Sequence, residues 1–162
     1  MLKKQRFFII CLTSILMVCC MFATTKGSTV SYAKDAKNEN NVVPKVKEIK
    51  QLGKNQVEVS FDKETDITKT TKPENYWVQC LSDTKPSGIA TVGKDEKICE
   101  KNALTSNQLE ITQKDTSNQV YILTFKEDIE PKIQYKFIIC HITSPGASDY
   151  TGENGSFELM GK

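Results

Sequence analysis

The strict alternation of apolar and polar residues in the segment QVEVSF (56–61) is the feature that most restricts how this chain can fold. Valine, valine and phenylalanine stand at every second position, with glutamate and serine between them. Successive side chains of a β-strand point to opposite faces, so the pattern predicts a strand with one buried face and one face in water.

Short apolar or alternating runs of this kind recur along residues 46–160, separated by segments rich in turn residues. The predicted strands cover residues 46–52, 56–61, 75–81, 89–92, 98–99, 108–112, 119–125, 134–142 and 156–160. The polar, Thr- and Lys-rich residues 62–73 are expected to form a loop, and no long run after residue 33 keeps a helical period. The spacing of about 8–12 residues predicts one all-β domain, a β-sandwich of about seven to nine strands.

A proline and a tyrosine occupy alternate positions of the segment IEPKIQYKF (129–137). In immunoglobulin and related β-sandwiches, a tyrosine near the start of a strand returns its hydroxyl to the backbone a few residues upstream. Pro131 suits an exposed crossing that does not need its N–H. We therefore expect Tyr135 and Pro131 to be structural residues of such a tyrosine corner, in an Ig-like or fibronectin-III-like sandwich.

With this corner, the region from Pro44 to Leu159 resembles the bacterial Ig-like domains found in S-layer and other Gram-positive surface proteins. The resemblance is carried by PKV (44–46), VEVSFD (57–62), ENY (74–76) with Val78, the corner strand 129–139, the loop DYTGEN (149–154) and Phe157. It implies a sandwich fold in a secreted or cell-surface setting, and it implies no catalytic residue.

The first 33 residues have the three parts of a signal peptide. Three basic residues within the first six positions precede an apolar stretch over residues 7–23, and SYA at 31–33 has small residues where a signal peptidase inspects the chain. We expect cleavage after Ala33, a polar linker over residues 34–43 and the sandwich domain over residues 44–162.

Two other interpretations of this N-terminal segment stay open. An uncleaved anchor is one, since the apolar stretch is near the lower limit of about 17 residues for crossing a bilayer. Lipid attachment at Cys19 or Cys20 is the other, although valine precedes the first of them. We expect a secreted, extracellular protein with no membrane contact after cleavage, and association with the cell envelope under either alternative.

The charge of the domain excludes one class of partner. The chain has 22 basic and 20 acidic residues, but four of the bases and none of the acids lie before residue 34. Residues 34–162 therefore carry 18 bases against 20 acids, a net charge of −2, and the single arginine of the chain is Arg6. Because nucleic-acid readers depend on arginine and a clustered basic face, we expect no nucleic-acid partner.

Three cysteines follow the signal segment: Cys80, Cys99 and Cys140. An odd number allows at most one disulfide among them in an oxidising compartment, and small buried thiols are the alternative. His141 is the only histidine, and its neighbour Cys140 would point to the opposite face of a strand. With no Cys-x-x-Cys spacing and no nucleophile or phosphate motif, we expect a non-enzymatic protein.

Acidic residues gather in two loops, at Asp62, Glu64 and Asp66 and again at Asp149 and Glu153. Oxygen clusters of this kind bind calcium outside cells, so these five side chains are candidate calcium ligands, with ordinary solvated loops as the alternative. No other cofactor is expected.

Tyr76 and Trp77 are adjacent in a predicted strand, so one of them faces the core and the other does not. We expect Trp77 in the core, as in many Ig-type sandwiches. If Trp77 were exposed, it would instead be the anchor of a binding patch.

The function we expect is adhesion to, or recognition of, an extracellular protein or cell-wall glycan by a monomeric module. A structural subunit or accessory of an envelope assembly, and a soluble inhibitor of an extracellular enzyme, are the alternatives.

Overall fold

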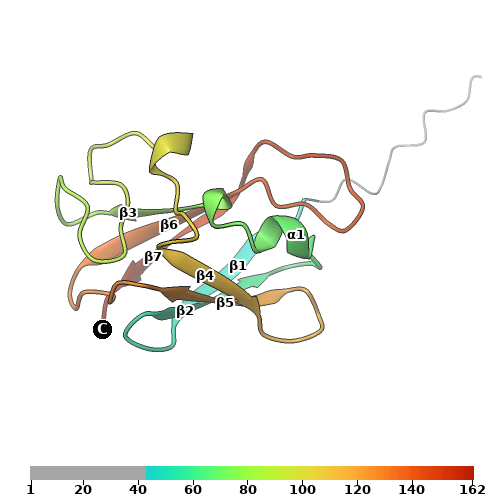
Figure 1. The fold of residues 1–162 in the computed structure, drawn as a ribbon, viewed down its shortest axis with the longest axis horizontal. Coiled ribbons are helices and arrows are strands. Elements are labelled where there is room, and N and C mark those ends of the chain that lie inside the picture. Colours follow the sequence, from blue (N-terminus) through green and yellow to red (C-terminus); the bar gives the residue numbers. More distant parts are fainter. Residues whose placement is uncertain (1–42) are drawn as a thin grey trace, which may run out of the picture. The chain divides into compact units, whose positions relative to one another are not determined.

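Two antiparallel sheets make up residues 43–162, the part of the chain that the computed structural model describes (Figure 1). The first sheet has the order β1 (Val46–Gln51), β2 (Gln56–Phe61), β5 (Val120–Phe125), β4 (Leu109–Gln113). The second has the order β3 (Tyr76–Cys80), β6 (Gln134–Cys140), β7 (Glu153–Met160). The all-β sandwich is thus confirmed, while the signal peptide and nearly all of the expected linker lie outside the described residues.

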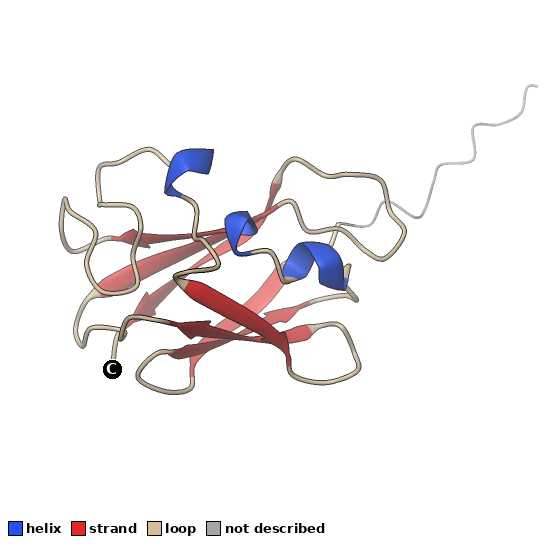
Figure 2. Ribbon diagram, in the orientation of Figure 1, coloured by secondary structure: helices blue, strands red, loops and turns tan. Residues whose placement is uncertain are grey.

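Helical turns are few among the described residues (Figure 2). The α-helix α1 (Ile67–Thr70) interrupts the expected loop 62–73, because Asp66 caps it by accepting the N–H of Thr68. Two short 3₁₀ turns are η1 (Pro73–Asn75) and η2 (Glu100–Asn102). Over residues 43–162, no helix is long and apolar enough to cross a membrane.

The core between the sheets follows from the alternation in the sequence. In β2 and β5 every second residue is buried, and these faces meet the buried face of β6. Two aromatic pairs fill the space edge to face, Phe61 with Tyr121 at 6.1 Å and Phe125 with Phe137 at 6.2 Å between ring centroids. The second pair joins the two sheets. β5 and β6 are central strands, as their apolar composition predicted.

Trp77 does not lie in the core between the sheets, contrary to expectation. Tyr76 and Val78 face that core, whereas Trp77 packs on the outer face of the β3–β6–β7 sheet. There it forms a second buried cluster with Val92, Ala103 and Ile138, and its indole N–H donates to the carbonyl of Cys99 at 2.9 Å. The alternation was predicted correctly, but the segment that covers the outer face was not.

That cover is the segment 82–107, where the strands expected at 89–92 and 98–99 are absent. The first is reduced to a single parallel bridge between Val92 and Gln79 in β3, and the second is extended chain before η2. Ile89 enters the core between the sheets while Val92 enters the outer cluster. The segment therefore crosses the edge of the sheet instead of extending it.

Tyr135 joins the start of β6 to the connection that precedes it. Its hydroxyl accepts the N–H of Glu130 at 3.2 Å, its ring is fully buried, and this burial raises the pKa of its hydroxyl. Gly88 packs against the same oxygen so closely that a Cβ there would lie 2.6 Å from it. Pro131 lies exposed in the turn between Glu130 and β6.

We expect Tyr135→Phe to lower the free energy of unfolding by about 1–3 kcal/mol, because it leaves the Glu130 N–H without its acceptor. Urea unfolding followed by tryptophan fluorescence measures this. Tyr150→Phe is the matched control, since that hydroxyl donates to the carbonyl of Glu153 in an exposed bond. Equal stability of the two variants would contradict a structural role for the corner.

Asn154, at the start of β7, is fully buried, and both the oxygen and the nitrogen of its side-chain amide form hydrogen bonds. Its Oδ1 accepts the N–H of Ile142 at 2.9 Å, and its Nδ2 donates to the carbonyls of Ile142 and Pro44, both at 2.8 Å. One side chain therefore closes the loop 142–154 and joins it to the chain that enters β1.

Asn154→Ala removes all three bonds at once. We expect it to lower the free energy of unfolding by about 3 kcal/mol or more, since buried backbone groups lose their partners. Asn107→Ala, at an exposed position with no side-chain hydrogen bond among the described residues, is expected to change stability by less than about 0.5 kcal/mol. A similar loss in both variants in thermal or urea unfolding would argue against the clamp.

Candidate functional site

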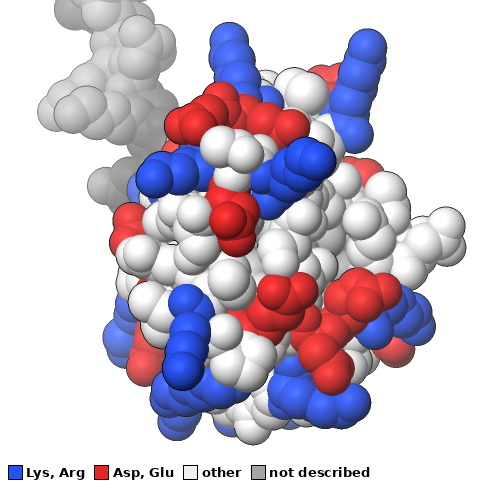
Figure 3. Space-filling model, turned by 90° about the vertical axis from the view of Figure 1, so that its left-hand side faces the viewer, with Lys and Arg blue, Asp and Glu red and all other residues white. Residues whose placement is uncertain are grey.

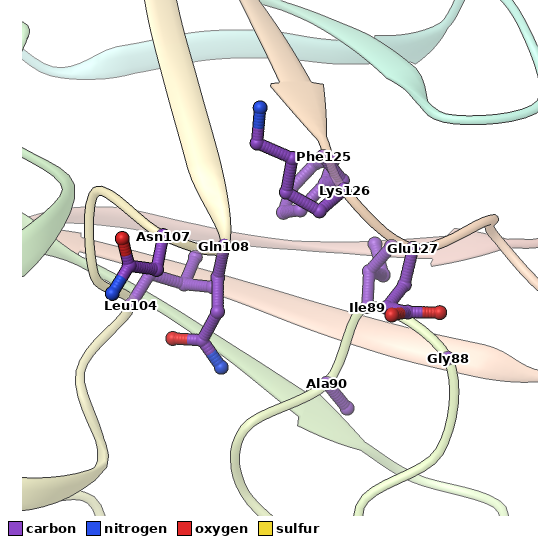
Figure 4. A pocket seen from close by; sticks show the side chains of 9 residues that line it. All are labelled: Gly88, Ile89, Ala90, Leu104, Asn107, Gln108, Phe125, Lys126 and Glu127. Carbon is purple, nitrogen blue, oxygen red and sulfur yellow. The ribbon is translucent and has the colours of Figure 1, made fainter.

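A cleft of about 160 Å³ opens at the end of the sandwich where β5 ends and β4 begins (Figure 4). Three separate segments surround it: the loop 88–90, the turn before β4 and the residues after β5. Its lining consists of Gly88, Ile89, Ala90, Leu104, Asn107, Gln108, Phe125, Lys126 and Glu127.

The floor of the cleft is apolar and rigid. Ile89, Leu104 and Phe125 are each less than 5% exposed and belong to the core between the sheets. Because these side chains are fixed by core packing, the floor needs no rearrangement to meet a ligand.

Two side-chain amides form one wall of the cleft. The Oε1 of Gln108 accepts the N–H and the hydroxyl of Thr105 at 3.1 and 2.9 Å, which orients its Nε2 away from this turn. In Figure 4 the Gln108 amide projects toward Ala90. Neither this Nε2 nor the Asn107 amide has a hydrogen-bond partner within residues 43–162, so both can bind a ligand.

Lys126 and Glu127 add one charge of each sign to the rim, and both are exposed. Neither forms an ion pair within the described part of the chain. Basic and acidic side chains are also interspersed on the face shown in Figure 3, so no single sign dominates there. This electrostatic setting suits a neutral polar ligand better than a polyanion.

The thiols and the histidine lie elsewhere. Cys80 faces the core between the sheets, while Cys140 packs against the outer cluster that holds Trp77. His141 follows β6 with a left-handed backbone (φ 65°), so strand alternation does not apply to it, and its ring meets Trp77 edge to face at 6.2 Å. No hydrogen bond joins Cys140 to His141 among the described residues.

The disulfide considered among the three cysteines is not formed, since Cys80, Cys99 and Cys140 are all free thiols. Cys80 and Cys140 point to opposite faces of the same sheet, so these two cannot pair. Cys99 is exposed in the segment that covers the outer face.

The three thiols should react in a defined order with N-ethylmaleimide. We expect Cys99 to react first and Cys140 more slowly, because Cys140 is half-buried and this burial raises its pKa. Cys80 should react only on unfolding, since it is fully buried. Peptide-level mass spectrometry over time measures the order, and labelling of native Cys80 as fast as Cys99 would contradict the assignment of faces.

The five calcium candidates are not brought together. Over residues 43–162 no three His, Cys, Asp or Glu side chains gather in a way that could hold a metal ion. Asp62 accepts the N–H of Lys45, Asp66 caps α1, and Asp149 is paired with Lys69 at 2.6 Å.

The remaining two candidates are also apart. Glu64 accepts from the side chain of Asn118 at 2.9 Å, and Glu153 begins β7. Most of these acids therefore serve turns, caps and ion pairs. The prediction of a calcium site finds no geometric support.

Sequence reasoning did not single out the cleft residues Asn107, Gln108, Lys126 and Glu127. They lie in turns at the ends of strands, and their only signal in the sequence is a polar run between two apolar ones. The opposite wall, at Gly88–Ala90, belongs to the segment 82–107, which contains none of the residues that carry the sequence resemblance. Only the folded chain shows that these segments meet.

No family model matches the chain, and no curated protein matches it. Among solved structures, the chain is similar to the S-layer protein SbsC residues 31–844 (TM-score 0.49, 13% identity) and to SbsC domains 1–6 (0.49, 12%). It is also similar to the N-terminal part of the bacterial S-layer protein SbsC (0.49, 12%). Each match covers 74% of this chain.

The chain spans 14% of the length of the first two of these structures and 23% of the third. The likeness thus concerns one part of a longer protein and assigns no activity, substrate or partner to the chain. Membership of an Ig-like family stays a prediction.

Proposed function

We propose that this chain is a non-enzymatic, Ig-like recognition module, secreted or held at the cell surface, that binds a glycan in the cleft. The observation that carries the proposal is the pair of available amides, Asn107 and Gln108, above a buried apolar floor. Small-ligand sites share this composition, with few oriented polar groups on an apolar base, although the cleft, at about 160 Å³, is smaller than the roughly 300–1,000 Å³ of most such pockets.

The strand order supports the Ig-like part of the proposal. Sheets ordered β1-β2-β5-β4 and β3-β6-β7 correspond to the four- and three-stranded sheets of constant-type immunoglobulin domains. The cleft is built from the connections between β3 and β4 and between β5 and β6, at one end of the sandwich, and loops held by a rigid scaffold commonly carry binding residues.

The chemistry of the cleft favours a sugar as ligand. The Asn107 amide offers donors and an acceptor, the Gln108 Nε2 offers further donors, and the Glu127 carboxylate supplies further acceptors at the rim, as the hydroxyls of a sugar require. The apolar floor suits the C–H face of a sugar ring or an acetyl methyl group. At about 160 Å³ the cleft takes one such unit, so a longer glycan would continue across the surface.

The edges of the sheets favour a monomeric module over a subunit that assembles edge to edge. The edge of β3 is covered, since Val92 bridges to Gln79 and the N–H of Leu104 donates to the carbonyl of Tyr76. β4 has only five residues. Short or covered edges of this kind limit the addition of strands from another chain.

The remaining edges, those of β1 and β7, are tied to each other by side chains. Near one end Lys45 Nζ donates to the carbonyl of Glu153, and near the other the Lys162 N–H donates to the side chain of Gln51. This edge of the sandwich therefore faces another part of the same chain.

Binding of soluble oligosaccharides from bacterial cell-wall glycan, measured by calorimetry, tests the proposal. We expect Gln108→Ala and Asn107→Ala each to weaken binding about tenfold, the effect of losing one or two hydrogen bonds to the ligand. Gln119→Ala is the matched control, because that amide lies at the opposite end of β5. Absence of binding by the native chain, or an equal effect of all three variants, would overturn the proposal.

A further inference from the structure

A second, open hollow of about 280 Å³ lies at the other end of the sandwich, where β6 ends. The segment of α1 and η1 forms one side and the loop after β6 forms the other. Its polar lining includes Lys69, Lys72, His141, Asp149 and Thr151. β6 begins near the cleft and ends here, so the two sites are separated by the length of the strand.

Three groups in the hollow are available to an anion. The Lys72 ammonium, the His141 ring and the Thr151 hydroxyl have no hydrogen bond or close ion pair within residues 43–162. Lys72 is the N-cap of η1, His141 follows the end of β6, and Thr151 lies in the loop before β7. The three groups therefore approach the hollow from different elements.

The hollow already holds one carboxylate. Asp149 is bound by Lys69 at 2.6 Å, and this hydrogen bond and charge, with a contribution from Lys72, lower the pKa of Asp149. The Asp149 side chain is 92% exposed, so only the lysines retain it. An exposed ion pair of this kind is weak and exchangeable.

The position of His141 is fixed through its backbone. Its φ of 65° lies in the left-handed region, where histidine, asparagine and aspartate are enriched among residues other than glycine. The His141 N–H donates to the carbonyl of Gly152, and the next residue, Ile142, is held by Asn154. The ring thereby lines the hollow while its edge-to-face partner Trp77 is buried below.

We propose that this hollow binds a phosphate-bearing ligand, whose oxyanion replaces the Asp149 carboxylate at Lys69 and is also bound by Lys72 and His141. Point charges, an imidazole and a hydroxyl from several directions can surround a tetrahedral oxyanion, and lysine ammonium groups bind phosphate as point charges. A phosphate group also carries more negative charge than the single carboxylate that Lys69 holds. This site shares no residue with the cleft and does not depend on the proposed glycan binding.

Trp77 provides the readout, because it is the only tryptophan of the chain and contacts His141. The full chain is titrated with glycerol 3-phosphate, with inorganic phosphate and, separately, with acetate. We expect a saturable change of tryptophan fluorescence with both phosphate compounds and at least tenfold weaker binding of acetate. Acetate binding as tight as phosphate, or no saturable binding of either phosphate compound, would overturn the proposal.

Two substitutions of opposite expected effect test the displacement of Asp149. Lys72→Ala should weaken phosphate binding about tenfold, whereas Asp149→Asn should tighten it several-fold, because it removes the competing carboxylate. Lys47→Ala, at an exposed site on β1, is the matched control for lost positive charge. Equal weakening by Lys72→Ala and Lys47→Ala, or unchanged or weaker binding by Asp149→Asn, would contradict the mechanism.

His141→Asn removes the imidazole while keeping a residue that tolerates the left-handed backbone. Because this change also alters the surroundings of Trp77, binding is measured by calorimetry, and we expect a several-fold loss. Gln108→Ala, in the cleft, should leave phosphate binding unchanged. A loss in Gln108→Ala equal to that in His141→Asn would place the anion outside the hollow and overturn the assignment.

Discussion

The side-chain amide of Asn154 is the contact on which the arrangement of one whole end of the sandwich depends. It binds both backbone groups of Ile142 and the carbonyl of Pro44, so it closes the loop 142–154 against the entry to β1. The next carbonyl, that of Thr143, accepts the N–H of Asp66, the residue that caps α1. Since a buried amide without hydrogen-bond partners is costly, Asn154 favours the loop conformation in which its amide oxygen and nitrogen all have partners. Lys69 on α1 and His141 before the loop are positioned as a consequence.

A second constraint comes from strand β3, which is covered on both faces. Tyr76 and Trp77 alternate across it, and each anchors a different cluster. The segment 82–107 must therefore supply apolar side chains to both faces, and it does so by crossing the sheet edge between Ile89 and Val92. The crossing places residues 88–90 beside the end of β5, where they form a wall of the cleft. The path of the segment 82–107 therefore both covers Trp77 and forms one wall of the cleft.

The sequence was sufficient to predict the strands whose burial alternates with period two. Residues 56–61 and 119–125 became β2 and β5 nearly to the residue, because the hydrophobic pattern and the backbone geometry agree there. It was insufficient wherever burial depends on a distant segment. Trp77 and Ile89 are apolar in either case, and only the covering segment decides which face buries them. The cleft escaped prediction for the same reason, since its amides come from a turn with no periodicity and its opposite wall is about 18 residues away.

The two ends of the sandwich differ in how they are prepared for a ligand. The cleft is preformed: its floor belongs to the core, and Thr105 orients Gln108 through two hydrogen bonds. The hollow is occupied in the free protein by the Asp149 carboxylate, so an incoming anion exchanges one ion pair for another. Preformed neutral contacts respond little to salt, whereas exposed charges are screened over about 8 Å at physiological ionic strength. Neither proposed site requires the core to move, so a ligand bound at one is expected to leave the other unchanged.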